Sequence, residues 1–509
     1  MKNIVIILCV LVGFTTNAQL NPQSKKITEK FFPNPDQVLE TTPALQKKRG
    51  YTNYEELLSF LDNLADNHSD KISMSFIGKS QKGRDIPMVI LTTPNDKEKI
   101  KVWMQGGLHG NEPASTESLL YLLDRLLNGE SYADILENVE LAVIPMANID
   151  GYLKNNRYAA NGLDLNRDQT KLMAPETVIL KKAFAKFNPE VAVDFHEYRP
   201  YRRDYARMGD FGVTNMYDAM FLYSGNLNIP QNLRTLTNEL FVENTRQVLD
   251  EHDYTHHPYI SSRKHYGEIH INQGSISARS SATNNALTNT ISTLVEIRGV
   301  ALGRTSFKRR IHSSFLIAMS YLRTAAENVQ LVKNEIKKAT KQNNKVVVDY
   351  ERGVYKDSVK FIDVSAAEYV EFEMTIRDAW KAKPKLTRSR PKAYIIDANR
   401  TDLIEKLETL GIEVQVLEEE KSFKIEKYVV DSYWRKPIRY EKMKLQTVGV
   451  NLVKEEKTFP KGTTIIMMDQ RRANLASVIL EPEAPNSFVS FGVLETKKGE
   501  TLPIYRLIN

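Results

Sequence analysis

Residues 51 to about 330 alternate between nearly continuous apolar runs and stretches whose apolar residues recur at helical spacing. The apolar runs are rich in valine and isoleucine and include "IKVWMQ" (100–105), "VELAVIP" (139–145), "EVAVDF" (190–195) and "TISTLVEI" (290–297). Strands that are apolar on both faces must be covered on both faces, as happens when helices connect the strands of a sheet. The pattern therefore predicts an α/β fold, with a mixed, mostly parallel sheet covered by helices on both faces.

Polar residues follow the carboxyl ends of these four runs. His109 comes after the first run and Asn148–Gly151 after the second, while His196 and Glu296 lie at the ends of the third and fourth. In open α/β sheets, ligands bind at the edge where parallel strands end. We therefore expect these residues to meet at one edge of the sheet.

The segment "HGNE" offers two metal-capable side chains, His109 and Glu112, three residues apart. Zinc hydrolases use three protein ligands and leave a fourth position open for water. His196 is the candidate third ligand, although its neighbour Glu197 is a rival for the functional role. The sequence thus predicts a metal site if the fold brings these segments together.

The remaining candidate ligands are weaker. Three histidines lie in "DEHDYTHHPY" (250–259), a polar stretch that is typical of an exposed loop, and nothing nearby completes a site around His265 and His270. The single cysteine is Cys9. Because it lies in the N-terminal apolar segment, we expect no thiolate nucleophile or thiolate ligand in the mature chain.

The N-terminus has the pattern of a secretory signal peptide, which we expect at residues 1–18. Lys2 precedes the apolar run Ile4–Phe14, and small residues follow at Thr16 and Ala18. The run is too short to cross a bilayer, and a retained anchor is the alternative. No later run reaches the ~18 apolar residues that a membrane helix needs. We therefore expect a secreted or periplasmic protein without disulfides.

The net charge of +7 and the pI of about 9.0 raise the question of an anionic partner such as nucleic acid. The basic residues are scattered, with modest clusters at "KKATKQNNK" (337–345) and "KAKPKLTRSRPK" (381–392). Solvated faces explain such clusters better, and the second, which contains proline, is typical of a connector. The sequence therefore predicts no nucleic-acid partner.

The sequence pattern changes after a long polar helix, which we expect at 320–340. The segment "EYVEFEMTI" (368–376) alternates with period two, as a half-buried strand does. Residues 392–419 predict a strand, an amphipathic helix that ends at Gly411, and another strand. "SFVSFGVLE" (487–495) is a further β run. The sequence therefore predicts a β-rich α/β region in the last third of the chain.

Five segments in order resemble the motifs of the zinc metallocarboxypeptidase family, the carboxypeptidase A/B type and its secreted bacterial relatives. The resemblance spans residues 51 to 300, about half of the chain. The segments are "HGNE" (109–112), "NIDGY" (148–152), "RYAANGLDLNRD" (157–168), "DFHEY" (194–198) and "LVEIRG" (294–299). Together with the N-terminal pattern and the change in sequence character after residue 340, it leads us to expect three parts: a signal peptide at 1–18, a carboxypeptidase-like catalytic domain at 19–340 and a β-rich accessory region at 341–509.

The resemblance also implies the metal site. His109, Glu112 and His196 would bind one Zn²⁺ per chain. Asp164 matches the aspartate that hydrogen-bonds a ligand histidine, with His109 as the expected partner, and so fixes its tautomer. Two neutral imidazoles and one carboxylate leave a zinc ion with a residual charge of about +1, which favours ionisation of water.

The catalytic and substrate-binding roles follow from the same resemblance. Glu296 would act as general base on the water that zinc activates and would pass the proton to the leaving amine. Arg157 would stabilise the oxyanion. Asn166 and Arg167 would bind the terminal carboxylate of the substrate, where a guanidinium offers two parallel hydrogen bonds.

The interval before Glu296 departs from the family. The digestive enzymes carry a mobile tyrosine there, whereas this chain has no tyrosine between Tyr266 and Glu296. The role of Tyr259 or Tyr266 is therefore left open. Arg279 is the only charged residue after Glu268 and before Glu296, apart from one histidine, and "RPYRRDYAR" (199–207) adds more arginines. A basic pocket that favours acidic side chains is one interpretation.

Three functions remain after this comparison. The first is a secreted zinc carboxypeptidase that hydrolyses the C-terminal peptide bond of peptides or proteins. The second keeps the same fold and chemistry but acts as an amidase on cell-wall peptides, which also end in free carboxylates. The third, a non-catalytic peptide-binding protein, is disfavoured because the predicted base and all three predicted metal ligands are present.

Overall fold

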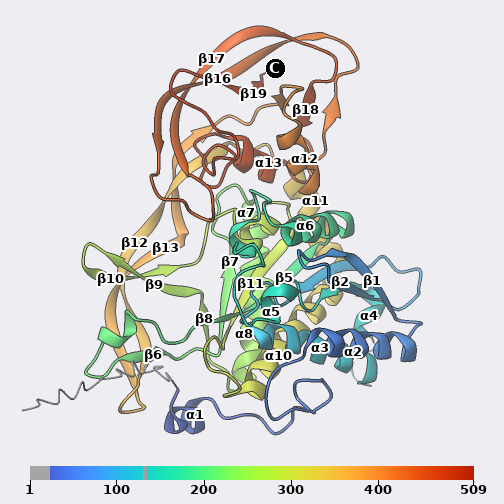
Figure 1. Cartoon of the computed structure of the whole chain (residues 1–509), viewed down its shortest axis with the longest axis vertical. Helices are drawn as coiled ribbons and strands as arrows, with labels where there is room; N and C mark the ends of the chain where they lie inside the picture. Colours follow the sequence, from blue (N-terminus) through green and yellow to red (C-terminus); the bar gives the residue numbers. More distant parts are fainter. Residues whose placement is uncertain (1–22, 130–131, 133, 509) are drawn as a thin grey trace, which may run out of the picture.

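The computed structural model describes residues 23–129, 132 and 134–508 (Figure 1). The predicted signal peptide at 1–18 lies outside the described residues. None of the helices within these ranges is both long and apolar enough to span a membrane.

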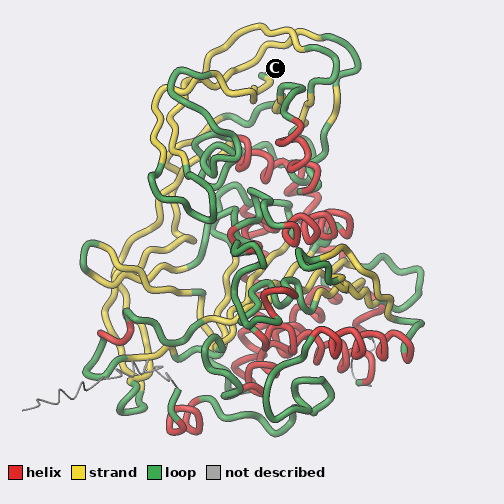
Figure 2. The backbone as a smooth tube through the Cα atoms, in the orientation of Figure 1, coloured by secondary structure: helices red, strands yellow, loops and turns green. Residues whose placement is uncertain are grey.

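An eight-stranded sheet forms the centre of the α/β region (Figure 2). Its middle strands β4, β3, β5 and β11 are mutually parallel. At one side, β2 pairs antiparallel with β4 and β1 antiparallel with β2; at the other side, β7 pairs antiparallel with β11. This mixed arrangement confirms the predicted fold class. In spatial order the strands are β1 (Ile72–Lys79), β2 (Asp85–Leu91), β4 (Val139–Ile144), β3 (Ile100–Gln105), β5 (Val191–Tyr198), β11 (Ile291–Arg298), β7 (Ala219–Tyr223) and β8 (His256–Pro258).

Helices cover both faces of this sheet. On one face, Tyr321 of α10 (Phe307–Glu327) donates a hydrogen bond to Thr293, at 2.8 Å. On the other face, Phe184 of α6 (Pro175–Phe187) meets the ring of Trp103 edge-on. These two strand residues point to opposite faces because Thr293 shares its face with Met104, the residue after Trp103. The buried side chains between the layers form one large core.

The other helices surround these layers. They are α1 (Lys25–Phe31), α2 (Tyr54–Asn67), α3 (Pro113–Asn128), α4 (Ile135–Asn138), α5 (Ile149–Tyr152), α7 (Gln231–Leu236), α8 (Glu243–Glu251), α9 (Ser281–Ala286), α11 (Val329–Thr340), α12 (Thr401–Thr409) and α13 (Ala473–Leu480). Short 3₁₀ turns occupy Leu165–Arg167 and Tyr205–Arg207, and a π-helical stretch occupies Thr237–Val242.

The long helix expected at 320–340 is wrong, because two helices, α10 and α11, meet there. Asn328 lies between them with φ −122°, outside the helical region. Its side-chain amide donates to the carbonyl of Thr324 at 2.8 Å and satisfies an acceptor at the end of α10. Asparagine competes with the helical backbone in this way, so the chain breaks at this residue.

A second sheet joins strands from both sides of residue 340. Its spatial order is β6 (Val213–Asn215), β12 (Val346–Asp363), β13 (Tyr369–Arg388), β10 (Glu268–Gln273) and β9 (Ile260–His265). The long strands β12 and β13 run from this sheet toward the C-terminal part (Figure 1). Strands β12 and β13 follow residue 340 but pair with β6 and β10, which precede it. The division of the chain at residue 340 therefore stays a prediction.

The connector expected at 381–392 is wrong over most of its length, because β13 continues to Arg388 and pairs with β12. Pro384 is tolerated in this strand because β10, the neighbour on the other side, pairs with β13 only as far as Asp378. Beyond that point β13 is an edge strand, where a missing N–H donor costs little.

A third sheet and two helices make up the C-terminal part. The predicted strand–helix–strand at 392–419 is confirmed, and Gly411 ends the helix with φ +71°. The strand expected at 487–495 is wrong: this segment forms successive turns, with Gly492 at φ +72°. In spatial order the sheet contains β15 (Gln415–Val416), β18 (Thr464–Met467), β14 (Ala393–Ile396), β19 (Thr501–Leu507), β16 (Lys421–Arg435) and β17 (Gln446–Phe459).

Candidate metal centre and substrate cleft

His109 and Glu112 lie in the tight connection between β3 and α3. Gly107 in this connection has φ +64°, and a Cβ atom there would lie 2.7 Å from the hydroxyl of Thr116. Only glycine fits such a position without displacing its neighbours. Pro113 then starts α3, so Glu112 is held at the boundary of the helix, directly after the strand end.

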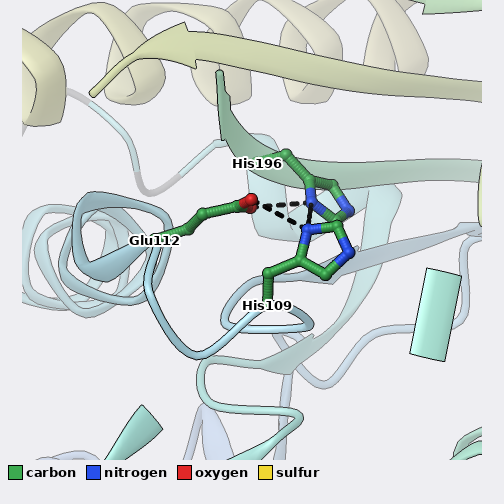
Figure 3. A group of neighbouring side chains, drawn as sticks. All are labelled: His109, Glu112 and His196. Atoms are coloured by element: carbon green, nitrogen blue, oxygen red, sulfur yellow. Dashed lines mark hydrogen bonds and ion pairs between the residues drawn. The ribbon is translucent and has the colours of Figure 1, made fainter. Parts of the chain in front are cut away.

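His196 and Glu296 come from the adjacent parallel strands β5 and β11, where they are register partners. The fold brings His196 to His109 and Glu112: one ligand atom from each of the three lies within 4.8 Å of the others, and all three residues are buried (Figure 3). Glu112 points between the two imidazole rings. Among the residues that the structure describes, these three side chains form the only group that could hold a metal ion.

The hydrogen-bond partners of this group are compatible with a cation between its ligand atoms. Nε2 of His109 lies 3.0 Å from Asp164, and Nε2 of His196 lies 2.9 Å from Asp194. A carboxylate only accepts, so in the neutral rings both protons reside on Nε2. Both Nδ1 atoms then present lone pairs, 3.0 Å from each other and each 2.8 Å from a Glu112 oxygen. Two imidazole nitrogens and one carboxylate therefore fit a zinc ion.

Asp194 was missed in the sequence. It lies two residues before His196 in β5, on the same face of the strand, and accepts from Ser281 Oγ as well as from His196. The period-two rule for strands would have indicated it as a partner of His196.

Asp164 links the metal-site group to Arg157. One of its oxygens accepts from the backbone N–H of Asn166 at 2.8 Å, and the other lies 3.0 Å from Arg157 Nε. Arg157 also extends Nη1 to 3.5 Å from Glu112. Burial would raise the pKa of Asp164, but the neighbouring His109 and Arg157 hold it well below its ordinary value. Asp164 therefore fixes the positions of both groups.

Glu296 faces the same space without a partner of its own. No hydrogen bond or ion pair to its carboxylate occurs within the described residues. Burial, and then the negative charge of Glu112, raises the pKa of Glu296 to about 7. A carboxylate with such a pKa can both accept and release a proton near neutral pH.

These groups line a cavity of about 880 Å³. Arg157, Asn166, Arg167 and Glu296 all border it, together with His109. The side-chain oxygen of Asn166 accepts from the N–H of Ser281 at 2.8 Å, and Arg167 donates to the carbonyl of Asn166 at 2.8 Å. Five of the eight predicted site residues therefore line one cavity, and the other three, Glu112, His196 and Asp164, contact His109.

The structure gives different positions to Tyr259, Tyr266 and Glu197, whose roles the sequence left open. Tyr259 borders the cavity, whereas Tyr266 lies on the turn between β9 and β10 and is 97% exposed. Glu197 is buried against Arg310, at 3.1 Å, and accepts from the N–H of Ala114 at the start of α3. These contacts indicate that Glu197 stabilises the start of α3 and is not a metal ligand in this arrangement.

The histidines near residue 255 are not simply in an exposed loop. Residues 256–258 form β8, which pairs with β7 at the edge of the main sheet. The ring of His257 stacks on Tyr217, with centroids 4.4 Å apart. The expectation of an exposed loop is therefore wrong for His256 and His257, which pair at the sheet edge, whereas His252 lies exposed in the turn after α8.

A turn of the C-terminal part, Tyr440–Met443, reaches this site and had no signal in the sequence. Glu441 and Lys442 have φ +47° and +63°, and Tyr440 and Met443 exchange backbone hydrogen bonds of 2.9 Å, as in a two-residue hairpin turn. The carboxylate of Glu441 accepts from the backbone N–H of Asp164 at 3.0 Å. The accessory region therefore contacts the loop that carries the predicted site residues.

The chain is similar in sequence to known zinc carboxypeptidases. A family model described as zinc carboxypeptidase matches residues 57–201. Carboxypeptidase 2 of Trichophyton rubrum is 31% identical over 470 residues, covering 90% of this chain and 87% of that protein, and carboxypeptidase 2 of Trichophyton equinum is 30% identical over the same length. The crystal structure of carboxypeptidase A from Helicoverpa armigera shows 18% identity, with a TM-score of 0.42, over 56% of this chain and 78% of that one.

The fold and the group of metal-capable residues define a metal-dependent hydrolase. With relatives of this similarity over most of its length, the chain belongs to the zinc carboxypeptidase family and is a metallocarboxypeptidase, an enzyme that hydrolyses peptide bonds. The similarity to the fungal enzymes also extends well beyond residues 57–201 and includes most of the C-terminal part.

Proposed function

We propose that this enzyme removes the C-terminal residue of peptides with one Zn²⁺ per chain, held by His109, Glu112 and His196. The observation that carries the proposal is the convergence of three possible ligand atoms, from His109, Glu112 and His196, next to a partnerless Glu296 in the same cavity as Arg167. A zinc ion in this place supplies a Lewis acid and makes a neighbouring water more acidic.

Glu296 moves the protons. With a pKa raised to about 7, it takes a proton from the attacking water and then delivers it to the amine that leaves. Its strand position directly beside His196 places it next to the metal-site group. The absence of a hydrogen-bond partner within the described residues leaves its carboxylate free for this transfer.

Arg157 and Arg167 act on different parts of the substrate. Arg157, held by Asp164 and extended toward Glu112, faces the place where the carbonyl oxygen gains negative charge. Arg167 and Asn166 bind the terminal carboxylate, which marks the end of the chain. An enzyme with this division of roles cleaves one residue from the end of a peptide.

The proposal extends to localisation and to substrate. The N-terminal sequence supports export through a signal peptide, to the medium or the periplasm. Peptide and protein C-termini are the proposed substrates. Cell-wall peptides have no support from the relatives, which are named as carboxypeptidases, so the amidase alternative is not retained.

Replacing Glu296 by Gln tests the proposal directly. The amide keeps the size of the side chain but cannot accept the proton, so turnover of a peptide with a free C-terminus should fall on the order of a hundredfold or more. Metal content, measured by atomic absorption, should stay near one zinc per chain. Undiminished hydrolysis by this variant would exclude Glu296 as the base.

A further inference from the structure

The charges that border the cleft are strongly unbalanced. Among the described residues, seven arginines line the cavity, against two carboxylates, Glu197 and Glu296. Glu197 is already engaged by Arg310, and Glu296 lies at the metal-site end. The residues that line the cavity therefore carry more positive than negative charge.

Three of the seven arginines have partners within the protein. Arg157 bonds to Asp164, Arg167 donates to the carbonyl of Asn166, and Arg352 donates to backbone carbonyls, including that of Arg377 at 3.0 Å. The other four make no side-chain hydrogen bond or ion pair within the described part of the chain. We call these four the arginine wall: Arg199, Arg202, Arg203 and Arg279.

Arg279 is the most constrained member of the wall. It is partly buried, and burial lowers the pKa of its guanidinium; Arg167 lowers it further, while Tyr440 and the more weakly acting Asp164 and Glu441 oppose this. The ring of Tyr440, from the C-terminal turn, lies 5.0 Å from the guanidinium carbon. A cation–π contact of this kind holds the position of a guanidinium but supplies no counter-charge.

Arg202 approaches the cleft from the segment after β5. Burial, followed by the charge of Glu296, raises the pKa of the Tyr259 hydroxyl, and Arg202, Arg167 and Arg157 oppose that rise. Arg202 and Arg279 therefore border the same cavity as Arg167, each from a different segment of the chain. Arg167 lies close enough to Arg279 to lower the pKa of its guanidinium, and partly desolvated cations of this kind repel one another unless an anion binds between them.

A single substrate carboxylate is too few to pair with all of the arginines that line the cavity. The terminal carboxylate of a peptide is taken up by Asn166 and Arg167 in the proposed function. Arg279 and Arg202 would then remain without an anion. A second carboxylate on the same C-terminal residue would supply it, and a planar guanidinium can bind that group through two parallel hydrogen bonds.

We propose that the arginine wall selects peptides whose C-terminal residue is glutamate or aspartate. The inference rests on the proposed function and adds a substrate class to it. Arg279, held against Tyr440, and Arg202 bind the side-chain carboxylate, while Arg167 binds the chain end. The C-terminal region takes part in substrate selection through Tyr440.

The test compares two acylated peptides that differ only in a C-terminal glutamate or glutamine. Their side chains have nearly the same shape, so the ratio of kcat/KM isolates the charge. We expect the zinc-loaded enzyme to prefer the glutamate peptide about tenfold or more, the range for a hydrogen bond between charged groups. Calorimetric binding of both peptides to the zinc-loaded Glu296→Gln variant should give the same preference without turnover.

Variants then assign the preference to the wall. Arg279→Gln and Arg202→Gln should each bring the glutamate-to-glutamine ratio toward one. The matched control is Arg207→Gln, an exposed arginine of the same segment as Arg202 that does not border the cavity, and it should retain the ratio. Circular dichroism checks folding, and the Arg202 variant decides the result if the Arg279 variant does not fold.

Two outcomes would overturn the inference alone. Equal binding and equal kcat/KM for the two peptides in the wild type is the first. The second is a ratio that persists in both wall variants, including the case in which Arg279→Gln slows both peptides equally and thus acts only on the chain end. If neither peptide is bound or cleaved while metal is present, the proposed function falls together with the inference.

Discussion

The metal end of the cleft and the arginine wall differ in charge and in origin. At the metal end, His109, Glu112 and His196 come from strand ends of the central sheet, with buried carboxylates behind both histidines. The wall comes from loops, and its best-held member, Arg279, is backed by a tyrosine from the C-terminal part. One end can bind a cation, and the other can bind anions.

This difference explains how a peptide end would be oriented. The reacting carbonyl needs positive charge at its oxygen, and the chain end carries negative charge a few atoms away. A cavity with a cation site at one end and arginines along its wall accommodates both parts in only one direction. Under the proposed roles, binding and reaction are separated in space, and mutations should separate them.

The largest expected effect is at the metal end. His196→Ala removes one of three ligands, so the variant should lose most of its zinc and its hydrolysis on the order of a thousandfold or more, because a Lewis acid contributes several kcal/mol. Atomic absorption and a peptide assay measure both losses. His265→Ala is the control and should keep both. Full metal content in the first variant together with loss in the second would reverse the assignment.

A smaller effect is expected where the C-terminal turn supports the site. Glu441→Ala removes the acceptor for the Asp164 N–H, which loosens the loop that positions Arg157. We expect kcat/KM to fall roughly tenfold, within the range for a hydrogen bond to a charged group, with zinc retained. Lys444→Ala, an exposed position just after the turn, should have no effect. Unchanged kcat/KM in the Glu441 variant would show that the turn is dispensable.

The sequence predicted the metal end better than the wall for a physical reason. His109, Glu112 and His196 are placed by β3 and β5, whose apolar runs leave few alternative registers. Arg279 and Tyr440 meet across 161 positions of the chain, and no periodic pattern links a turn in one region to a loop in another. The first arrangement is local to one sheet, whereas the second depends on how two regions dock.

The errors in the fold have the same origin. Residues 381–388 have the composition of a connector but form a strand, because β12 lies alongside and pairs with them. Residues 487–495 have β propensity but form successive turns, which are closed by local backbone hydrogen bonds such as that from Phe491 N–H to the Ser487 carbonyl. Propensity is a weak guide wherever tertiary pairing decides. Asp194 is different, since a period-two reading of β5 would have identified it.

The central claim is that this enzyme recognises a free chain end through Arg167. The direct measurement is the hydrolysis of one peptide with a free or an amidated C-terminus, by the wild type and by Arg167→Ala. We predict that the wild type prefers the free carboxylate roughly a hundredfold or more, since an unpaired guanidinium costs a few kcal/mol, and that the variant loses most of this preference. Equal cleavage of the free and amidated peptides by the wild type would contradict the claim.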